Sequence, residues 1–437
     1  MNAQAGTKKA LQLCCLAAVN YLLFYGLGIF LARTLGVAGF GSYNVAVATI
    51  IMLASLATLG LEKFSLRVFP SYIEQGDWSY ARGFARFSSL IIFAVSSLAA
   101  ILWVAGNWRS YDVFHTYPLA AAGLVVAFVT SMALVMFLVE MLSAGGRPVL
   151  ATLVYRLFLP LSVVSLIGAV TLLGGGLTVR RAVICYGFSW VLSLSLILEL
   201  ARHALPVEIW KAAPRMRVES RQWLWRSVPF LAQSFMMTLF ASSGVILLEL
   251  LCPGGADIGI YAAAMQVSSF AVLMATATNR FYAPRASILL DRKDWDGIVR
   301  MKRERHAWVN PMVLLFLAVI LIFGRKIMGL YGPDFERGYP ALCILAAGVA
   351  VSVKYAMAPV ALHFFGQSRW VLGATCVAGL LNVALLVVLG GLFGATGAAV
   401  AYSLSLGGMA LAMYIKGLSW IRRQQGQVSH EDSSNRK

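Results

Sequence analysis

The chain has 437 residues, of which 60% are hydrophobic and 12% are charged, with 39 glycines. This composition excludes an ordinary soluble domain, because soluble proteins carry a far larger share of charged residues. It indicates a polytopic membrane protein, and the net charge of +18 has to be explained within that class.

Apolar stretches long enough to cross a bilayer recur along the whole chain. Each crossing of a hydrocarbon core of about 30 Å needs about 20 apolar residues in a helix. Such stretches lie near residues 11–32, 43–61, 87–106, 118–140, 152–173, 182–201, 229–250, 260–279, 308–324, 341–364, 371–389 and 395–415. The first is too long for the apolar region of a signal peptide and lacks a convincing cleavage site before Arg33. We therefore expect an all-α fold with about 12 transmembrane helices.

Basic residues concentrate in alternate connecting segments. The segments on the N-terminal side of the membrane hold about four times as many of the 36 Lys and Arg residues as the opposite side. The positive-inside rule then predicts that both the N-terminus and the C-terminus are cytoplasmic. Because the basic excess is spread over many short inner loops, topology explains it and no nucleic-acid partner is expected. Trp223 and Trp225, beside Arg221 and Arg226, are predicted to anchor the chain at the membrane interface.

Cysteine and histidine residues are dispersed along the chain. The six cysteines form no C-x-x-C pair, and the five histidines do not cluster. No disulfide framework, metal site or cofactor is predicted from this pattern.

Short matches between the two halves indicate an internal repeat. They recur in order, at nearly constant spacing and in equivalent loops: Gly41-Ser42-Tyr43 with Gly259-Ile260-Tyr261, Asp77-Trp78 with Asp294-Trp295, and Gly146 with Gly366. A repeat of six spans re-enters the membrane with unchanged orientation, so the two copies are parallel. We expect two six-helix bundles related by a pseudo-two-fold axis along the membrane normal. Residues 1–206 form the first lobe, and residues 207–437 form the second with a short cytoplasmic tail.

Several motifs carry a resemblance to a known family. They are the stretch from Leu31 to Tyr43, Leu59-Gly-Leu-Glu-Lys-Phe64, Gly76-Asp-Trp78, Leu330-Tyr-Gly-Pro-Asp-Phe335 and Gly338-Tyr-Pro340. With these motifs the chain resembles the polysaccharide-transporter branch of the multidrug/oligosaccharidyl-lipid/polysaccharide exporter superfamily, over nearly its whole length.

The resemblance implies a flippase of the O-antigen or exopolysaccharide type in the bacterial inner membrane. Such a carrier moves an undecaprenyl-diphosphate-linked oligosaccharide from the cytoplasmic to the periplasmic leaflet by alternating access, for the synthesis of lipopolysaccharide or another cell-surface polysaccharide. Its expected partners are the lipid-linked oligosaccharide and membrane lipids. Whether it works with a polysaccharide polymerase and a chain-length regulator is left open.

Lys354 is the single cation within an apolar run, from 341 to 364. A lysine inside a span costs about 2.5–3.5 kcal/mol on insertion scales and usually faces a cavity or a partner. It could therefore carry a diphosphate across the membrane, and small residues share its helical face: Ala347, Ala350, Ala358 and Ala361. The alternative is an internal ion pair with Glu140, Glu199 or Glu249, the carboxylates nearest to the spans.

Five further residues are candidates for substrate binding. Arg156 and Arg280 lie near the inner ends of spans and could extend a basic path, or they could be interfacial anchors. Asn20, Gln233 and Gln266 lie within spans and could bind sugar hydroxyls, or they could join helices by hydrogen bonds. In the family that the chain resembles, the first, second, seventh and eighth spans border the central cleft, which favours these three.

The sequence also predicts local distortions and surface helices. Pro160 and Pro359 should kink the fifth and tenth spans, because proline removes a helical hydrogen bond. The inner segments 62–86 and 280–307 mix apolar and charged residues and are expected to form amphipathic helices on the inner leaflet.

Two rival functions make different demands on the sequence. An ion-coupled multidrug exporter of the same superfamily would share the architecture, but it would typically need an acidic residue within the spans of the first half. Here only Glu62, Glu140 and Glu199 lie near span ends. A membrane enzyme would need a catalytic segment, and the longest outer loops, 106–117 and 325–340, hold too few acid–base groups to suggest one. We therefore expect a carrier and not an enzyme.

Overall fold

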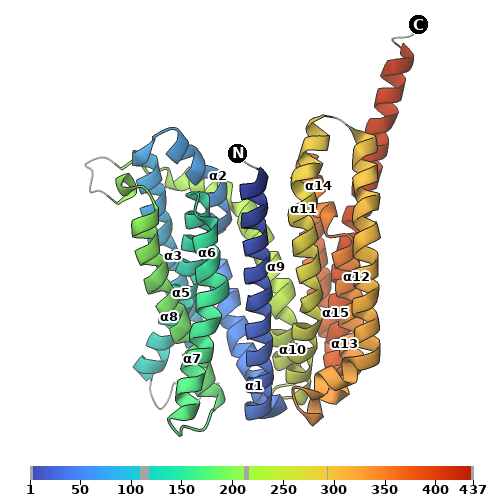
Figure 1. Cartoon of the computed structure of the whole chain (residues 1–437). Coiled ribbons are helices and arrows are strands. Elements are labelled where there is room, and N and C mark those ends of the chain that lie inside the picture. Colours follow the sequence, from blue (N-terminus) through green and yellow to red (C-terminus); the bar gives the residue numbers. More distant parts are fainter. Residues whose placement is uncertain (1–2, 109–117, 211–215, 293, 435–437) are drawn as a thin grey trace. The chain divides into compact units, whose positions relative to one another are not determined.

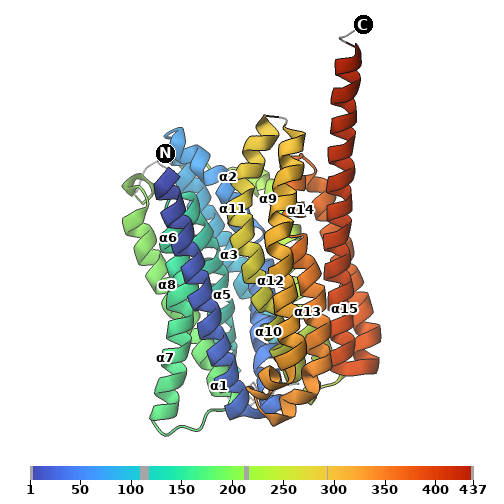
Figure 2. The same ribbon diagram turned by 45° about the vertical axis from the view of Figure 1, so that its right-hand side comes forward.

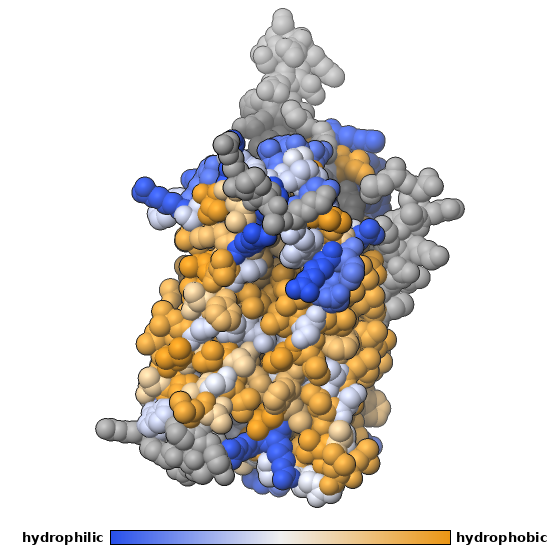
Figure 3. Space-filling model, turned by 90° about the vertical axis from the view of Figure 1, so that its left-hand side faces the viewer, coloured by the Kyte–Doolittle hydropathy of each residue, from blue (hydrophilic) through white to orange (hydrophobic). Residues whose placement is uncertain are grey.

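The computed structural model describes residues 3–108, 118–210, 216–292 and 294–434. Within these ranges the regular structure is helical throughout, which confirms the all-α membrane fold (Figure 1). On the face shown in Figure 3, hydrophobic side chains form a broad band and hydrophilic ones gather at its two ends. A lipid-facing surface produces this distribution, because the hydrocarbon core excludes polar groups.

The chain divides into two compact units, Met1–Ile246 and Leu247–Lys437. The helices that begin in the first are α1 (Ala3–Ala57), α2 (Leu61–Glu74), α3 (Trp78–Gly106), α5 (Pro118–Ala144), α6 (Pro148–Leu153), the π-helical turn η1 (Val154–Phe158), α7 (Leu159–Leu172), α8 (Val179–Ala204), the 3-10 turn η2 (Val207–Ile209) and α9 (Ser220–Leu251). The division lies inside α9, beyond the boundary between residues 206 and 207 that the sequence indicates.

The second unit continues from the end of α9. Its helices are α10 (Ala256–Ser268), the 3-10 turn η3 (Ser269–Ala271), α11 (Val272–Asp291), α12 (Trp295–Gly329), the 3-10 segment η4 (Pro333–Gly338), α13 (Tyr339–Lys354), α14 (Met357–Phe364) and α15 (Ser368–Ser434). In Figure 2 the last part of α15 extends beyond the other helices of this unit.

Two glycines divide the longest helices. The described residues contain 10 helical segments that are long and apolar enough to cross a membrane. Two of them, in α1 and α15, are interrupted by Gly36 (φ 71°, ψ 178°) and Gly394 (φ 54°, ψ −132°). These backbone conformations are open to glycine and costly for other residues. Each of the two helices therefore makes two passes, and the predicted set of about twelve crossings is recovered.

One helix lies at the centre of each unit. In the N-terminal unit α5 packs against α2, α3 and α8, and in the C-terminal unit α13 packs against α10, α12 and α15. These are the fourth and the tenth predicted spans, so equivalent spans hold equivalent positions. This agreement is what an internal repeat requires.

Both predicted proline distortions are present. The π-helical turn Val154–Phe158 ends two residues before Pro160. The tenth span is broken: α13 ends at Lys354 and α14 begins at Met357, just before Pro359. Proline cannot donate a backbone hydrogen bond to the carbonyl four residues earlier, which is that of Tyr355 here.

The segments predicted to lie on the inner leaflet differ from one another. Residues 61–74 do form a separate amphipathic helix, α2, whose apolar side is buried. The prediction for 280–307 was wrong, because these residues continue α11 to Asp291 and begin α12 at Trp295.

The two tryptophans of the predicted aromatic anchor differ in their exposure. Trp223 is only 2% exposed and its ring lies 5.3 Å from that of Phe84, whereas Trp225 is 79% exposed. Only Trp225 is therefore placed as an interfacial anchor.

Candidate functional site

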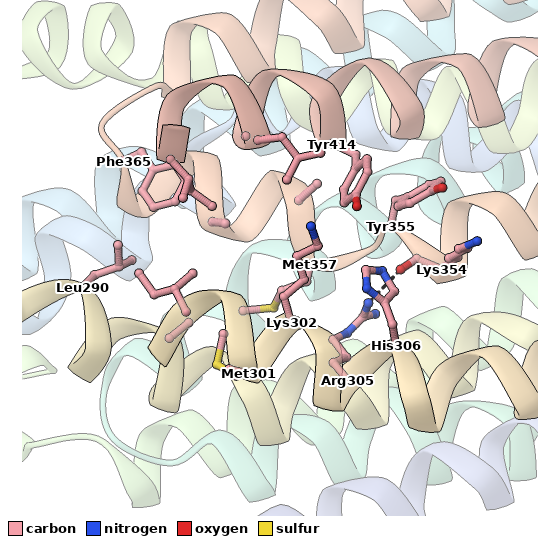
Figure 4. A pocket seen from close by; sticks show the side chains of 17 residues that line it. Leu290, Met301, Lys302, Arg305, His306, Lys354, Tyr355, Met357, Phe365 and Tyr414 are labelled. Atoms are coloured by element: carbon pink, nitrogen blue, oxygen red, sulfur yellow. Dashed lines mark hydrogen bonds between the residues drawn. The ribbon is translucent and has the colours of Figure 1, made fainter. Parts of the chain in front are cut away.

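A cavity lies inside the C-terminal unit, between α11, α12, α14 and α15 and next to the end of α13 (Figure 4). It has about 690 Å³ of empty space, counting the part that opens to solvent. Leu290 and Phe365 lie at one end, whereas His306 and Lys354 lie at the other. The basic side chains therefore gather towards one end of a cavity whose lining surface is mostly apolar.

The polar end is built around the break in the tenth span. Arg305, on α12, donates from Nη1 to the carbonyl of Lys354 at 2.7 Å and from Nη2 to the carbonyl of Val353 at 3.1 Å. Both carbonyls lie in the last turn of α13, where the break removes the donors four residues further on, although the N–H of Ala356 still reaches the carbonyl of Val353 at 3.3 Å. Arg305 is only 3% exposed, so the guanidinium replaces those donors inside the protein.

Residues of α11 also bond to groups at the break between α13 and α14. Asn279 donates from Nδ2 to the carbonyl of Ala356 at 3.1 Å, and Nη2 of Arg305 reaches Oγ1 of Thr278 at 3.5 Å. Side chains of two neighbouring helices therefore hold the break in place, because buried carbonyl groups need hydrogen-bond partners.

Aromatic rings hold the two lysines of the cavity. The rings of Tyr355 and Tyr414 lie 4.3 Å apart between centroids. Nζ of Lys302 is 4.9 Å from the centroid of Tyr414, and Nζ of Lys354 is 5.5 Å from that of Tyr355. His306 packs edge-on against both tyrosines. Cation–π contacts of this kind orient an ammonium group without neutralising its charge.

The basic groups lining the cavity are Lys302, Arg305, His306 and Lys354. Within the described part of the chain, no ion pair joins any of them to a carboxylate. Nε of Arg305 is buried without a hydrogen-bond partner. Arg305 is buried, whereas Lys302 and Lys354 are half-buried, and cations in such positions are normally paired, so their lack of a carboxylate partner favours an anionic ligand.

The three carboxylates considered as partners of Lys354 are engaged elsewhere. Glu140 pairs with Lys63, and Glu199 contacts Arg202 and His203 on its own helix. Glu249 accepts a hydrogen bond from the backbone of Gly254 at 3.3 Å. None of the three carboxylates contacts Lys354 within the described residues, so the alternative of an internal ion pair gains no support.

The small residues near Lys354 are divided by the break. Ala358 and Ala361, on α14, line the cavity with Lys354. Ala350 is buried within α13, whereas Ala347 is exposed. Only two of the four alanines expected on the same helical face as Lys354 therefore share the cavity with it.

Two predicted site residues are brought together in the N-terminal unit. Asn20 donates from Nδ2 to the carbonyl of Arg156 at 3.1 Å. Pro160, four residues further on, has no N–H to offer that carbonyl, so Asn20 supplies a donor. This hydrogen bond matches the alternative role of joining helices.

Two of the other predicted site residues, Gln233 and Gln266, are not among the residues that line the cavity. Gln266, on α10, accepts a hydrogen bond from the hydroxyl of Tyr331 at 3.2 Å. Gln233 is half-buried on α9. The side chain of Arg280 lies outside the described residues. Roles for these residues in substrate binding stay predictions.

Sequence reasoning missed Lys302, Arg305, His306 and Tyr414, because the first three were counted with an inner loop. A signal was available: Asp294 caps α12 by accepting a hydrogen bond from the backbone of Gly297 at 2.7 Å. An aspartate before an apolar and basic pattern with helical spacing predicts a helix that begins there.

The N-terminal unit contains a buried carboxylate. Glu62, on α2, is 5% exposed and accepts a hydrogen bond at Oε1 from the hydroxyl of Ser234 at 2.9 Å. Its Oε2 is buried without a partner. The sequence placed this residue near a span end, and the structure places it in the interior of the unit.

Comparison with solved structures defines the class of the fold. An inward-facing multidrug resistance MATE family transporter of the MOP superfamily aligns with a TM-score of 0.71 at 13% identity, over 93% of this chain and 95% of that one. An outward-facing one aligns at 0.68 and 15% identity, over 96% and 97%. A mutant of the MATE transporter VcmN of Vibrio cholerae aligns at 0.61 and 13% identity, over 96% and 98%. The fold is that of a MATE-like transporter.

Sequence comparison is more specific. The model of the family described as polysaccharide biosynthesis protein matches residues 7–281, so the chain belongs to that family. No curated protein matches the chain by sequence. The chain is therefore a multi-pass membrane protein of the polysaccharide biosynthesis family, with a fold similar to that of MATE transporters.

Proposed function

We propose that the protein is a flippase for a lipid-diphosphate-linked oligosaccharide, which it carries from the cytoplasmic to the periplasmic leaflet of a bacterial inner membrane by alternating access. Membership of the polysaccharide biosynthesis family supports a role in polysaccharide biosynthesis. The MATE-like fold supports a carrier and not an enzyme. The basic excess of the inner segments supports cytoplasmic termini.

One observation carries the choice of substrate class. Lys302, Arg305, His306 and Lys354 line one cavity without an ion pair to any carboxylate among the described residues. A diphosphate brings about two negative charges into a region of low dielectric constant, where it needs positive partners. The cations of this group, Lys302, Arg305 and Lys354, supply them.

The four basic residues would act differently. The ammonium groups of Lys302 and Lys354 lie against tyrosine rings and keep their donors free for phosphate oxygens. Arg305 is engaged with the carbonyls of the helix break, so it positions Lys354 more than it contacts substrate. His306 adds a ring nitrogen to the same end of the cavity.

The decisive experiment is leaflet translocation of a lipid-diphosphate oligosaccharide in proteoliposomes. We expect Lys302→Ala and Lys354→Ala each to lower the initial rate at least about tenfold, equivalent to about 1.4 kcal/mol of lost stabilisation. Lys326→Ala is the matched control, because Lys326 is exposed on α12 and does not line the cavity. Equal rates in all three variants, with normal insertion, would exclude the cavity from substrate binding.

A second candidate is an ion-coupled multidrug exporter. The buried and half-satisfied carboxylate of Glu62 favours it, because such a group can bind a proton or a cation. Cation-driven efflux of a cationic dye that is lost in Glu62→Gln, together with no flipping of lipid-linked sugar by the parent protein, would favour the exporter.

A polysaccharide polymerase and a chain-length regulator are further partners that co-purification would test.

A further inference from the structure

The turn between α1 and α2 has an unusual backbone. Leu59 has a φ of 52° and is the only residue other than glycine with a positive φ in the described part of the chain. Gly60, which follows it, has a φ of 72°. Strain at a leucine persists only where the surrounding contacts hold it, and such positions gather at sites that switch between states. The turn therefore needs a functional explanation.

The first part of α9 lies directly against this turn. A Cβ atom added to Gly60 would collide with the backbone nitrogen of Leu231 and would lie 2.6 Å from the carbonyl oxygen of Ser227. Only a glycine allows two backbones to come this close. The rings of Phe64 and Phe230 lie 6.0 Å apart between centroids and extend the same contact.

Polar contacts continue along α9 on both sides of the turn. Trp223 donates from Nε1 to the hydroxyl of Tyr72 at 3.1 Å. The hydroxyls of Ser55 and Thr238 lie 3.0 Å apart. Residues 223–238 of α9, here called the docking segment, are thus held against the end of α1 and against α2.

The docked arrangement also carries two costs. The hydrogen bond from Ser234 satisfies one oxygen of Glu62, but the other oxygen is buried without a partner. A buried polar atom without a partner is destabilising, because it has lost its hydration. Release of the docking segment would hydrate this oxygen and would free Leu59 to leave its strained conformation.

One helix connects the two compact units, and it is α9. The division lies between Ile246 and Leu247. Beyond it, Leu248 packs near α15, because a Cβ atom added to Gly390 would lie 3.6 Å from its side chain. Pro229 lies inside α9 and removes a helical hydrogen bond near the start of the helix. A proline of this kind lets a helix bend, so the first part of α9 can change its contacts while its last turn stays in place.

We propose that the docking segment is a latch, which is closed on the turn 58–60 and on α2 in this structure and is released from them during each transport cycle. The strain at Leu59 and the unsatisfied oxygen of Glu62 lower the free energy needed to leave the closed state. The inference rests on the proposed function, because a carrier that alternates between two states needs contacts that form and break. It assigns that role to one turn and one helix.

Thiol labelling measures release without any substrate. In Ser227→Cys the thiol replaces a hydroxyl on a residue that is 1% exposed, so a maleimide reacts with it only after release. Mass spectrometry of the full chain in detergent gives the rate. Adding Gly60→Ala should raise this rate at least about tenfold, because the new methyl group collides with the backbone of Leu231 and favours the released state. Gly76→Ala is the matched control: its φ of 71° makes alanine equally strained there, but a Cβ atom would meet no atom within 4 Å.

A disulfide makes the opposite change, and it also tests the proposal if the alanine variant does not fold. Ser55→Cys combined with Thr238→Cys links the docking segment to the end of α1. Oxidation should lower the labelling of Ser227→Cys at least about tenfold and stop translocation in proteoliposomes, and reduction should restore both. Ser96→Cys combined with Thr130→Cys is the matched control, because these buried hydroxyls lie 3.1 Å apart between α3 and α5 of the same unit. Its disulfide should change neither labelling nor translocation.

The outcomes separate the latch from the proposed function. Equal labelling in folded Gly60→Ala and Gly76→Ala, or labelling that the disulfide between the docking segment and α1 does not change, overturns the latch. Translocation at the parent rate with that disulfide formed overturns it too. Labelling that responds as expected, in a protein that moves no lipid-linked oligosaccharide, contradicts the proposed function alone.

Discussion

The guanidinium of Arg305 donates a hydrogen bond of 2.7 Å to the main-chain carbonyl of Lys354, across a sequence separation of 49 residues. This contact places a buried cation at the point where the tenth span breaks. It also fixes the backbone of the lysine that the sequence singles out. Arg305 therefore links the stability of the C-terminal unit to the geometry of the basic end of the cavity.

Replacing Arg305 should destabilise the protein. Arg305→Met removes a charged donor from two buried carbonyls, and hydrogen bonds to charged groups contribute about 1.5–3 kcal/mol. We expect a clear drop in the midpoint of thermal unfolding in detergent. Arg305→Lys should recover little of it, because a lysine lacks the planar fork that reaches both carbonyls. Arg303→Met, at an exposed position on the same helix, should leave the midpoint unchanged.

The effect of Arg305 should depend on Pro359. In Pro359→Ala the new N–H can bond to the carbonyl of Tyr355, and the last turn of α13 can continue into α14. Helical donors then replace Arg305, so its removal should cost less than in the parent. A double-mutant cycle should give a coupling energy of about 0.5–3 kcal/mol, the range for residues that share partners. Strictly additive effects would show that proline does not cause the break.

The number of crossings and the positions of the distortions could be predicted from the sequence because the bilayer imposes them. A helix that crosses lipid must satisfy its own backbone, so apolar length reveals each span and proline reveals where the pattern fails. By this logic Pro160 predicts a distortion that the structure shows as a π-helical turn. Pro359 predicts one that the structure shows as a break. Gly36 and Gly394 were not recognised as the turning points of α1 and α15, although both lie between predicted spans.

The cluster around Lys354 could not be predicted in the same way. Lys302 and Arg305 reach it through packing between α12 and the end of α13, and no local pattern encodes that meeting. Their basic charge made them look like ordinary residues of an inner segment. Lys354 itself was found because a cation inside an apolar run is costly wherever the run lies.

The tyrosine pair should contribute through its rings more than through its hydroxyls. The rings of Tyr355 and Tyr414 lie 4.3 Å apart, and Lys302 lies 4.9 Å from the second ring. Tyr414→Phe should preserve stability, whereas Tyr414→Leu should lose about 0.5–1.5 kcal/mol of aromatic pairing. Thermal unfolding would measure both. Phe393→Leu, at a 63% exposed position on α15, controls for the loss of an aromatic ring.

Gly394 should tolerate no side chain. Its φ of 54° with ψ of −132° is unfavourable for other residues, and a Cβ atom there would collide with the carboxylate of Asp257. We expect Gly394→Ala to reduce the yield of folded protein sharply, as measured by size-exclusion chromatography. Gly391→Ala is the matched control, because Gly391 is exposed and a Cβ atom added to it would meet no atom within 4 Å. Asp257→Ala should rescue Gly394→Ala only in part, because it removes the collision but not the backbone strain.

Glu62 and Ser234 should be strongly coupled. The hydroxyl of Ser234 donates to Oε1 of Glu62, whose other oxygen is already buried without a partner. Ser234→Ala should therefore destabilise the protein by about 1–3 kcal/mol, the cost of leaving a buried polar group unsatisfied. The same change should be nearly neutral in a Glu62→Leu background, where no carboxylate remains to be satisfied. Thermal unfolding of the four proteins gives the coupling, and Ser195→Ala, at an exposed serine of α8, is the control. An equal cost of Ser234→Ala in both backgrounds would show that the serine stabilises the unit without acting on the carboxylate.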